Sequence, residues 1–198
     1  MTKRPARNQL RIIGGKWRGR KIQFPNVEGL RPTSDRVRET LFNWLSDWIA
    51  GAYCLDLFAG SGALGFEASS RGAASVTLVD QHREVITALT NAKKMLAAAN
   101  ITIVQAQAAQ FIDQAPALAV FDLIFLDPPF GYLNLDALLK AIDNGNLLKP
   151  SGWIYLESVA NRTITVPTGW RLHRQKQAGQ VDYRLFQRLS SSLLQSKA

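Results

Sequence analysis

Short apolar runs alternate with longer amphipathic segments through most of this chain. The apolar runs are typical of buried strands, because each is brief and continuous. They fall at residues 54–58, 76–80, 102–105, 121–126 and 153–157. The segments between them have helical character and fall at residues 64–71, 83–99, 106–114 and 133–143. Strands that alternate with helices in this way predict an α/β fold with a doubly wound, mostly parallel sheet.

The end of the chain follows a different pattern. Residues 170–176 and 181–187 are strand-like and flank Ala178-Gly179. This arrangement predicts a C-terminal antiparallel hairpin that joins the sheet. We therefore expect three parts: a basic N-terminal extension at 1–29, one α/β domain at 30–188, and a tail at 189–198.

The extension contains two strand-like segments, 10–13 and 20–24, around a Gly-rich basic stretch, which predicts a β-hairpin with a basic tip. A helix should then begin near residues 33–35, where Thr33 or Ser34 can act as its cap. Its apolar face is predicted to consist of Val37, Leu41, Trp44, Leu45 and Trp48. By spacing, Arg36, Arg38 and Glu39 lie off much of that face.

Charge is distributed unevenly along the chain, which has a net charge of +9. Residues 1–38 contain 11 Lys/Arg and 2 Asp/Glu, so the rest of the chain is balanced. Such a segment predicts a polyanionic partner such as RNA, although a solvated arm is an alternative. Trp17 can stack on a base or can belong to the core. The candidate RNA contacts are Arg11, Lys16, Trp17, Arg18, Arg20, Arg31 and Arg36.

Other features narrow the class of protein. The single cysteine, Cys54, allows no internal disulfide, and no segment approaches the roughly 18 apolar residues of a membrane span. No apolar signal sequence follows the basic start, so we expect a cytoplasmic protein. His82 and His173 have no partners at metal-ligand spacing, so no metal is expected.

The segment Asp127-Pro128-Pro129-Phe130 follows the predicted strand 121–126. Two prolines cannot donate hydrogen bonds to a neighbouring strand, and they restrict the φ angle. They therefore form a rigid turn at the C-terminal end of the strand, where open α/β sheets bind ligands. The turn offers a carboxylate, free carbonyl groups and an aromatic ring. These groups can hold a planar base and accept hydrogen bonds from its exocyclic amine.

A glycine-rich loop follows the first strand of the sheet. Gly60, Gly62 and Gly65 match the G-x-G-x-x-G pattern, and Asp80 lies at the end of the next strand. This order predicts a nucleoside site in which Asp80 accepts hydrogen bonds from ribose hydroxyls. Asp56 would repel a pyrophosphate at this loop but would attract the sulfonium and amino groups of S-adenosylmethionine.

These motifs resemble those of class I S-adenosylmethionine-dependent methyltransferases that act on exocyclic amines. Residues 30–45 and 178–185 further resemble the family of bacterial 16S rRNA guanine-N2 methyltransferases. The resemblance implies a Rossmann-like fold, a first helix that covers the cofactor pocket, and catalysis by Asp127, Pro128 and Phe130. It also implies a single guanine as the target, the small ribosomal subunit as partner, and a monomer. The implied cofactor contacts are Thr33, Asp56, Phe58, Gly60, Gly62, Asp80 and Gln107.

Two details stay open at this point. Many class I enzymes have an acid after the third strand that contacts the adenine, whereas residues 105–110 contain none. A Gln side chain, with Gln107 as the candidate, or a backbone carbonyl group can take its place. An ordinary aspartate is a weak base, which favours an orienting role for Asp127. The competing functions are a DNA adenine-N6 methyltransferase and a non-catalytic RNA-binding assembly factor.

Overall fold

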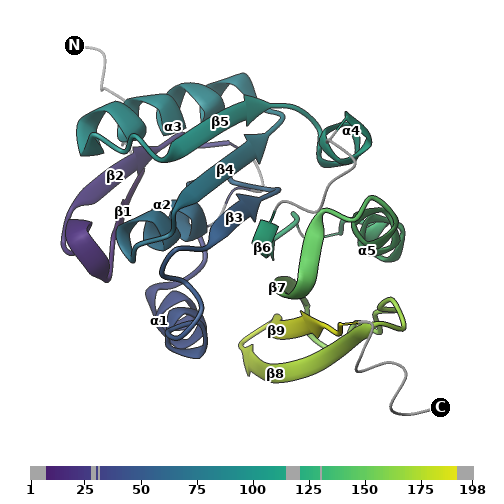
Figure 1. Cartoon of the computed structure of the whole chain (residues 1–198). Helices are drawn as coiled ribbons and strands as arrows, with labels where there is room; N and C mark the ends of the chain where they lie inside the picture. The colour runs from purple at the N-terminus through teal and green to yellow at the C-terminus, as the bar shows by residue number, and fades with distance from the viewer. Residues whose placement is uncertain (1–7, 28–29, 31, 115–120, 130, 191–198) are drawn as a thin grey trace.

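The computed structural model describes residues 8–27, 30, 32–114, 121–129 and 131–190. A seven-stranded sheet forms its centre, in the order β5-β4-β3-β6-β7-β9-β8 (Figure 1). The strands are β3 (Tyr53–Asp56), β4 (Ser75–Asp80), β5 (Ile101–Gln105), β6 (Phe121–Leu126), β7 (Leu148–Val159), β8 (Trp170–Ala178) and β9 (Val181–Arg188). Strands β3 to β7 pair parallel with one another, whereas β9 pairs antiparallel with both β7 and β8. The predicted doubly wound sheet with a terminal hairpin is confirmed.

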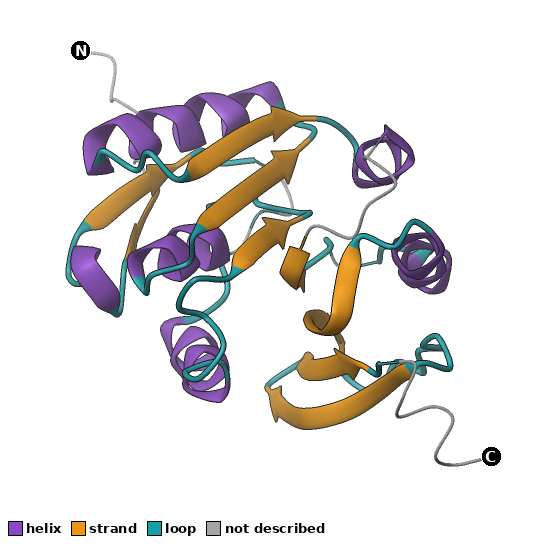
Figure 2. Cartoon of the chain, in the orientation of Figure 1, coloured by secondary structure: helices purple, strands orange, loops and turns teal. Residues whose placement is uncertain are grey.

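Helices cover both faces of the sheet (Figure 2). They are α1 (Asp35–Trp44), α2 (Ala63–Ser70), α3 (Arg83–Leu96), α4 (Ala108–Gln114) and α5 (Leu135–Asn144). Helices α1, α2 and α3 contribute to one apolar core, and α4 and α5 contribute to the other. Parallel strands must be buried on both faces, which explains why their sequences are apolar without alternation.

The ends of the helices follow local rules. Ser34 caps α1 and accepts a hydrogen bond from the Val37 amide at 3.4 Å, as the sequence predicts. Helix α3 ends earlier than predicted because Ala97 adopts a left-handed conformation, with φ of 50°. Strand β7 extends beyond the predicted strand 153–157 at both ends.

Strand β9 is inserted between β7 and β8, although it is the last of the strands that the structure describes. The turn between β8 and β9 contains Gly179, whose φ of 59° suits a residue without a side chain. Both partners of β9 lie antiparallel to it, so β8 runs in the same direction as the central strands.

The N-terminal hairpin consists of β1 (Asn8–Arg11) and β2 (Lys21–Phe24), joined through a short 3-10 helix at Gly15–Trp17. It packs into the main core rather than projecting as an arm. Trp17 is 6% exposed, and its amide donates to Ser70 Oγ at 2.9 Å. The predicted base-stacking role of Trp17 is therefore wrong, because a buried ring presents no free face to a base.

A buried ionic cluster attaches the hairpin to α1 and α2. Glu67 is fully buried and accepts hydrogen bonds from the Ile13 and Gly14 amides at 2.9 and 2.7 Å. It also pairs with Arg71 and Arg38, at 2.8 and 3.4 Å. Arg38 is 1% exposed, so this residue of the helix lies within the core and not on the solvated surface. The charges of the cluster can be buried because each has a partner. Their contacts with the hairpin hold it against α1 and α2.

No helix in the described part of the chain is long and apolar enough to cross a membrane. Cys54 is buried in β3, as expected for a small apolar residue.

Candidate active site

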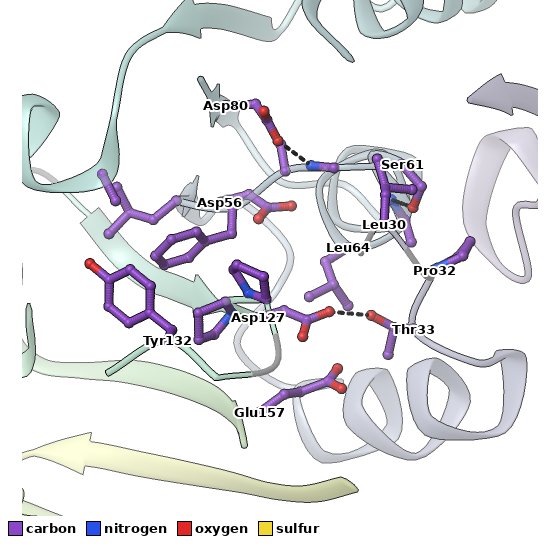
Figure 3. Close-up of a pocket in the computed structure, with 18 of the residues that line it drawn as sticks. Leu30, Pro32, Thr33, Asp56, Ser61, Leu64, Asp80, Asp127, Tyr132 and Glu157 are labelled. Carbon is purple, nitrogen blue, oxygen red and sulfur yellow. Dashed lines mark hydrogen bonds between the residues drawn. The ribbon is translucent and has the colours of Figure 1, made fainter. Parts of the chain in front are cut away.

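A cavity of about 590 Å³ opens where the central parallel strands end. Asp56 is the last residue of β3, Asp80 the last of β4, and Asp127 directly follows β6. Glu157 lies near the end of β7 and also lines the cavity. Figure 3 shows the four carboxylates along this wall, opposite Leu30, Pro32 and Thr33. Because β3 and β6 lie at the point where the strand order reverses, this is the expected ligand site of such a sheet.

The glycine loop forms one end of the cavity. Gly60 and Gly62 have φ angles of 47° and 77°, which are costly for other residues. The Gly60 amide donates to Asp80 Oδ2 at 3.0 Å. The His82 amide donates to Asp80 Oδ1 at 2.9 Å. The loop therefore orients Asp80, as required of a group that binds ribose hydroxyls.

Gly65 has a packing role in α2. A Cβ at this position would lie 2.1 Å from a methyl carbon of Leu78 in β4. The third glycine of the motif therefore permits close contact between helix and sheet, and the first two shape the loop.

Asp56 is 1% exposed, and its Oδ1 has no hydrogen-bond partner among the described residues. Burial, and then the charge of Asp127, raise the pKa of Asp56 to about 8, although the amides of Phe58 and Gly65 oppose this shift. A buried carboxylate oxygen without a partner is costly. A cationic or amine-bearing ligand would supply the missing partner, so the site fits the predicted cofactor.

Asp127 lies at the other end of the cavity. Thr33 Oγ1 donates to Asp127 Oδ2 at 3.0 Å, and Thr33, a predicted cofactor contact, also lines the cavity. Burial raises the pKa of Asp127 to about 6, and the Thr33 hydrogen bond opposes the shift. The site thus makes Asp127 a stronger base than an ordinary aspartate, which weakens the sequence-based case for a purely orienting role.

Glu157 is the main residue of the site that sequence reasoning missed. It is 7% exposed, and Tyr155 Oη donates to its Oε1 at 2.8 Å. Burial, and then the charge of Asp127, raise the pKa of Glu157 to about 8. Leu126 pairs with Leu156 across β6 and β7, so Asp127 and Glu157 are the next residues of neighbouring strands. Glu157 ends the predicted strand 153–157, which was a sequence signal for a carboxyl at this edge of the sheet, but only the register shows that it lies beside Asp127.

The remaining predicted cofactor residues, Phe58 and Gln107, both line the cavity. Phe58 packs edge-on against Tyr132, with 5.4 Å between ring centroids, and Tyr132 is a second aromatic residue that sequence reasoning missed. Pro128 also lines the cavity, whereas Phe130 lies outside the described residues.

The predicted RNA contacts lie away from the cavity. Arg11, Lys16, Arg18, Arg20 and Arg36 are exposed. Arg31 is outside the described residues. The described residues contain no group of three metal-binding side chains that could hold an ion.

Comparison with known proteins identifies relatives over nearly the whole chain. The family model "Conserved hypothetical protein 95" matches residues 10–187. Ribosomal RNA small subunit methyltransferase D of Escherichia coli K12 is 49% identical over 91% of this chain and 90% of its own. The protein of the same name from Haemophilus influenzae is 41% identical, over 92% and 95%.

The fold agrees with a solved structure. That of yhhF from Escherichia coli has a TM-score of 0.85 and 47% identity, and the match covers 93% of this chain and all of that one. The architecture is the α/β fold of class I methyltransferases, with antiparallel strands at the C-terminal end of the sheet. Because relatives well above 30% identity cover nine-tenths of the chain, this protein belongs to the ribosomal RNA small subunit methyltransferase D family.

Proposed function

We propose that this protein transfers a methyl group from S-adenosylmethionine to the exocyclic N2 amine of a guanine in 16S rRNA, within the small ribosomal subunit. One observation carries the proposal. The Asp127-Pro128-Pro129 turn and the wall formed by Asp56 and Asp80 line one cavity. A cofactor end and an amine-binding end are therefore within reach of each other. The names of the relatives support rRNA of the small subunit as the substrate.

At the cofactor end, Asp80 would accept hydrogen bonds from ribose hydroxyls, and Asp56 would accept them from an amino group. S-adenosylmethionine supplies a methyl group bound to a positively charged sulfur. Asp56 favours such a cation because its own charge is poorly solvated. Gln107, at the rim, is the candidate contact for the adenine edge.

At the amine end, Asp127 and the Pro128 carbonyl group would accept hydrogen bonds from the two N–H groups of the amine. A guanine amine is a poor nucleophile because its lone pair is delocalised into the ring. Hydrogen bonding aims that lone pair and stabilises the positive charge that grows on nitrogen. The nitrogen forms a bond to the methyl carbon as the carbon–sulfur bond breaks, and that electron pair remains on sulfur.

The methylated nitrogen must then lose a proton. Asp127 is the nearest candidate acceptor in the proposed arrangement, and its pKa of about 6 leaves it mostly ionised at neutral pH. Glu157, with a pKa of about 8, would hold a proton under the same conditions. The two neighbouring carboxyls then carry one negative charge instead of two, which limits their repulsion.

The base has to leave its stack to enter a cavity, so recognition includes a flipped or already exposed nucleotide. The exposed cations of the hairpin would contact the surrounding phosphates.

The test is methyl transfer from isotope-labelled S-adenosylmethionine to small subunits that lack the modification, to naked 16S rRNA and to duplex DNA. Nucleoside analysis then identifies the product. Label in N2-methylguanosine from the subunit is the expected result. Label in N6-methyladenosine from DNA would contradict the proposal and favour the adenine methyltransferase alternative.

A further inference from the structure

We propose that strand β8, together with the turn after α1 that carries Trp48, forms a second RNA-binding face, which contacts the phosphates of the substrate beside the cavity. The cations of this face are Arg171, Arg174 and Lys176, and its exposed ring is Trp48. The identity of the RNA rests on the proposed function, whereas the face itself rests on strand register, charge and aromatic contacts. The sequence alone predicts RNA contacts only in the N-terminal region.

A β-bulge brings the three cations to the same side of the sheet. Residues paired across neighbouring strands point to the same face. Arg171 pairs with Gln187, and after a register shift at residues 172–174 Arg174 pairs with Leu185 and Lys176 with Tyr183. A regular strand would put Arg171 and Arg174 on opposite faces, because side chains alternate. Bulges commonly redirect side chains in this way.

The strand partners show which face this is. Gln187 also pairs with Trp153, and Leu185 with Tyr155. Trp153, Tyr155, Leu185 and Tyr183 all belong to the core on the α1 side. The cations therefore lie on the α1 side, at the open edge of the sheet. They are exposed, and among the described residues none forms an ion pair with a carboxylate.

Strand β8, residues 170–178, contains no acidic residue. Asp182 on the neighbouring strand binds Gln175 and Arg184, and its strand partner is Gln177, on the opposite face from Arg174. Two acids of the α1 region, Glu39 and Asp47, are exposed. The charge of the strand itself is therefore entirely positive.

An aromatic cluster lies beside the cations. Trp48 packs on Trp153, with ring centroids 4.3 Å apart, and His173 contacts both rings edge-on, at 5.9 and 4.9 Å. Trp48 is still 40% exposed, so one part of its ring can stack on a base. Partial burial, and then the charges of Arg174 and Arg171, lower the pKa of His173. This agrees with a position close to both arginines.

The face is continuous with the active site and reaches toward the hairpin. Ala178, at the end of β8, lines the cavity, as do Gln180 and Val181. Helix α1 lies between the hairpin and the β8–β9 pair in Figure 1, and Trp44 of α1 stacks on Tyr183 of β9 at 5.4 Å. RNA held along β8 would reach the cavity at the Ala178 end of the strand, with Arg171 and Trp48 toward the other end.

The test compares the triple variant Arg171→Glu, Arg174→Glu, Lys176→Glu with wild type in binding to small subunits and 16S rRNA at several salt concentrations. We expect about a tenfold or greater loss of affinity at 0.1 M salt. The salt slope should fall by roughly 0.7 to 0.9 for each phosphate that the variant no longer neutralises. KM for the subunit should rise, with kcat at saturation little changed, because the cavity is intact.

Three further variants make the result specific. Trp48→Leu keeps an apolar contact with Trp153, and should weaken binding a fewfold without changing the salt slope, since stacking releases no counterions. Arg174→Glu is compared with Lys140→Glu, an equal charge change on exposed Lys140 of α5, on the other face of the sheet. Circular dichroism and thermal unfolding verify that each variant is folded.

The proposal would be overturned if Arg174→Glu and the triple variant bound RNA as tightly as Lys140→Glu does. If the triple variant instead self-associates on size-exclusion chromatography while its RNA binding is unchanged, the cations protect an open sheet edge, and the proposal is again wrong. If the wild-type protein methylates guanine and the triple variant binds RNA normally, only the proposed RNA-binding face is refuted. If the triple variant loses RNA binding but the wild-type protein methylates no guanine, only the proposed reaction is refuted.

Discussion

The cavity and the outer surface use charge in opposite ways. The cavity wall carries acids that are almost completely buried, such as Asp56 and Glu157, at 1% and 7% exposed. The outer surface carries cations such as Arg11, whose side chain is 63% exposed. Buried charges interact strongly and depend on exact position, whereas exposed charges interact weakly, add up and are screened by salt. Changes in the cavity should therefore cause large, local losses, and changes on the surface small, graded ones.

Replacement of Asp127 should give the largest effect. In Asp127→Asn the shape is kept, but the charge that stabilises the amine and can accept its proton is removed. We expect kcat to fall by about 10³-fold, with little change in the affinity for S-adenosylmethionine. Single-turnover methylation of small subunits and calorimetric binding of the cofactor measure the two quantities. A folded variant with near-normal turnover would refute the role of Asp127.

The effect of pH on cofactor binding, in wild type and in Asp56→Asn, tests the cofactor end of the same wall. Because a bound cation favours the ionised form and the pKa of Asp56 is about 8, wild-type affinity for the cofactor should rise with pH up to about 8. The rise should approach tenfold per pH unit. Asp56→Asn should bind about 10 to 100 times more weakly at pH 8, with a flatter profile. Equal pH profiles for the two proteins, measured by calorimetry, would exclude Asp56 as the ligand of a cation.

The cations of the N-terminal hairpin test the other side of the comparison, the exposed charges whose effects salt screens. Arg18→Glu with Arg20→Glu should weaken RNA binding by about five- to tenfold at low salt and reduce the salt slope. The loss should fade as salt is added, whereas the defect of Asp127→Asn should persist. Filter-binding measurements with 16S rRNA at several salt concentrations provide the comparison, with Lys140→Glu as control. Binding that is unchanged at all salt concentrations would return these residues to the alternative of a solvated surface.

Glu157 should show the smallest catalytic effect and a clear effect on stability. Since Glu157 should be protonated at pH 7, Glu157→Gln should keep activity within about threefold. Its raised folded-state pKa means that the native protein binds more protons than the unfolded chain. The free energy of unfolding contributed by Glu157 therefore falls as the pH rises from about 4 to 8.

Glutamine does not titrate, so the free energy of unfolding of Glu157→Gln does not fall in this way as the pH rises. Its melting temperature should therefore exceed that of wild type by a few degrees at pH 8 and by less at pH 5. Thermal unfolding at the two pH values measures the difference. An equal difference at both values would show that Glu157 does not titrate in this range. Loss of activity in a stable variant would mean that the reaction requires an ionised Glu157.

Sequence periodicity predicted the sheet well because its strands are apolar throughout and its helices are amphipathic. It also predicted Asp56, Asp80 and Asp127, because each follows or ends such a strand. Glu157 also ends a predicted strand, 153–157, but its place beside Asp127 depends on the pairing of β7 with β6, which periodicity does not give.

The errors have a common physical origin. Local sequence left Trp17 between base stacking and the core, and it placed Arg38 off the apolar face of its helix. Tertiary contacts override that local preference: Trp17 enters the core, and Arg38 donates to the Thr33 and Arg11 carbonyl groups at 3.2 and 3.0 Å. The bulge in β8 is likewise a result of pairing with β9, so its row of cations is not visible from the sequence alone.

The position of β9 has a consequence for synthesis of the protein. Strand β8 leaves the ribosome before β9, yet β9 is its partner in the sheet. Tyr183 of β9 pairs with Glu157, and Val181 lines the cavity. A nascent chain that has emerged only as far as β8 therefore has an open sheet edge and an incomplete pocket wall. The protein should gain its activity only after its final strand has been translated and inserted.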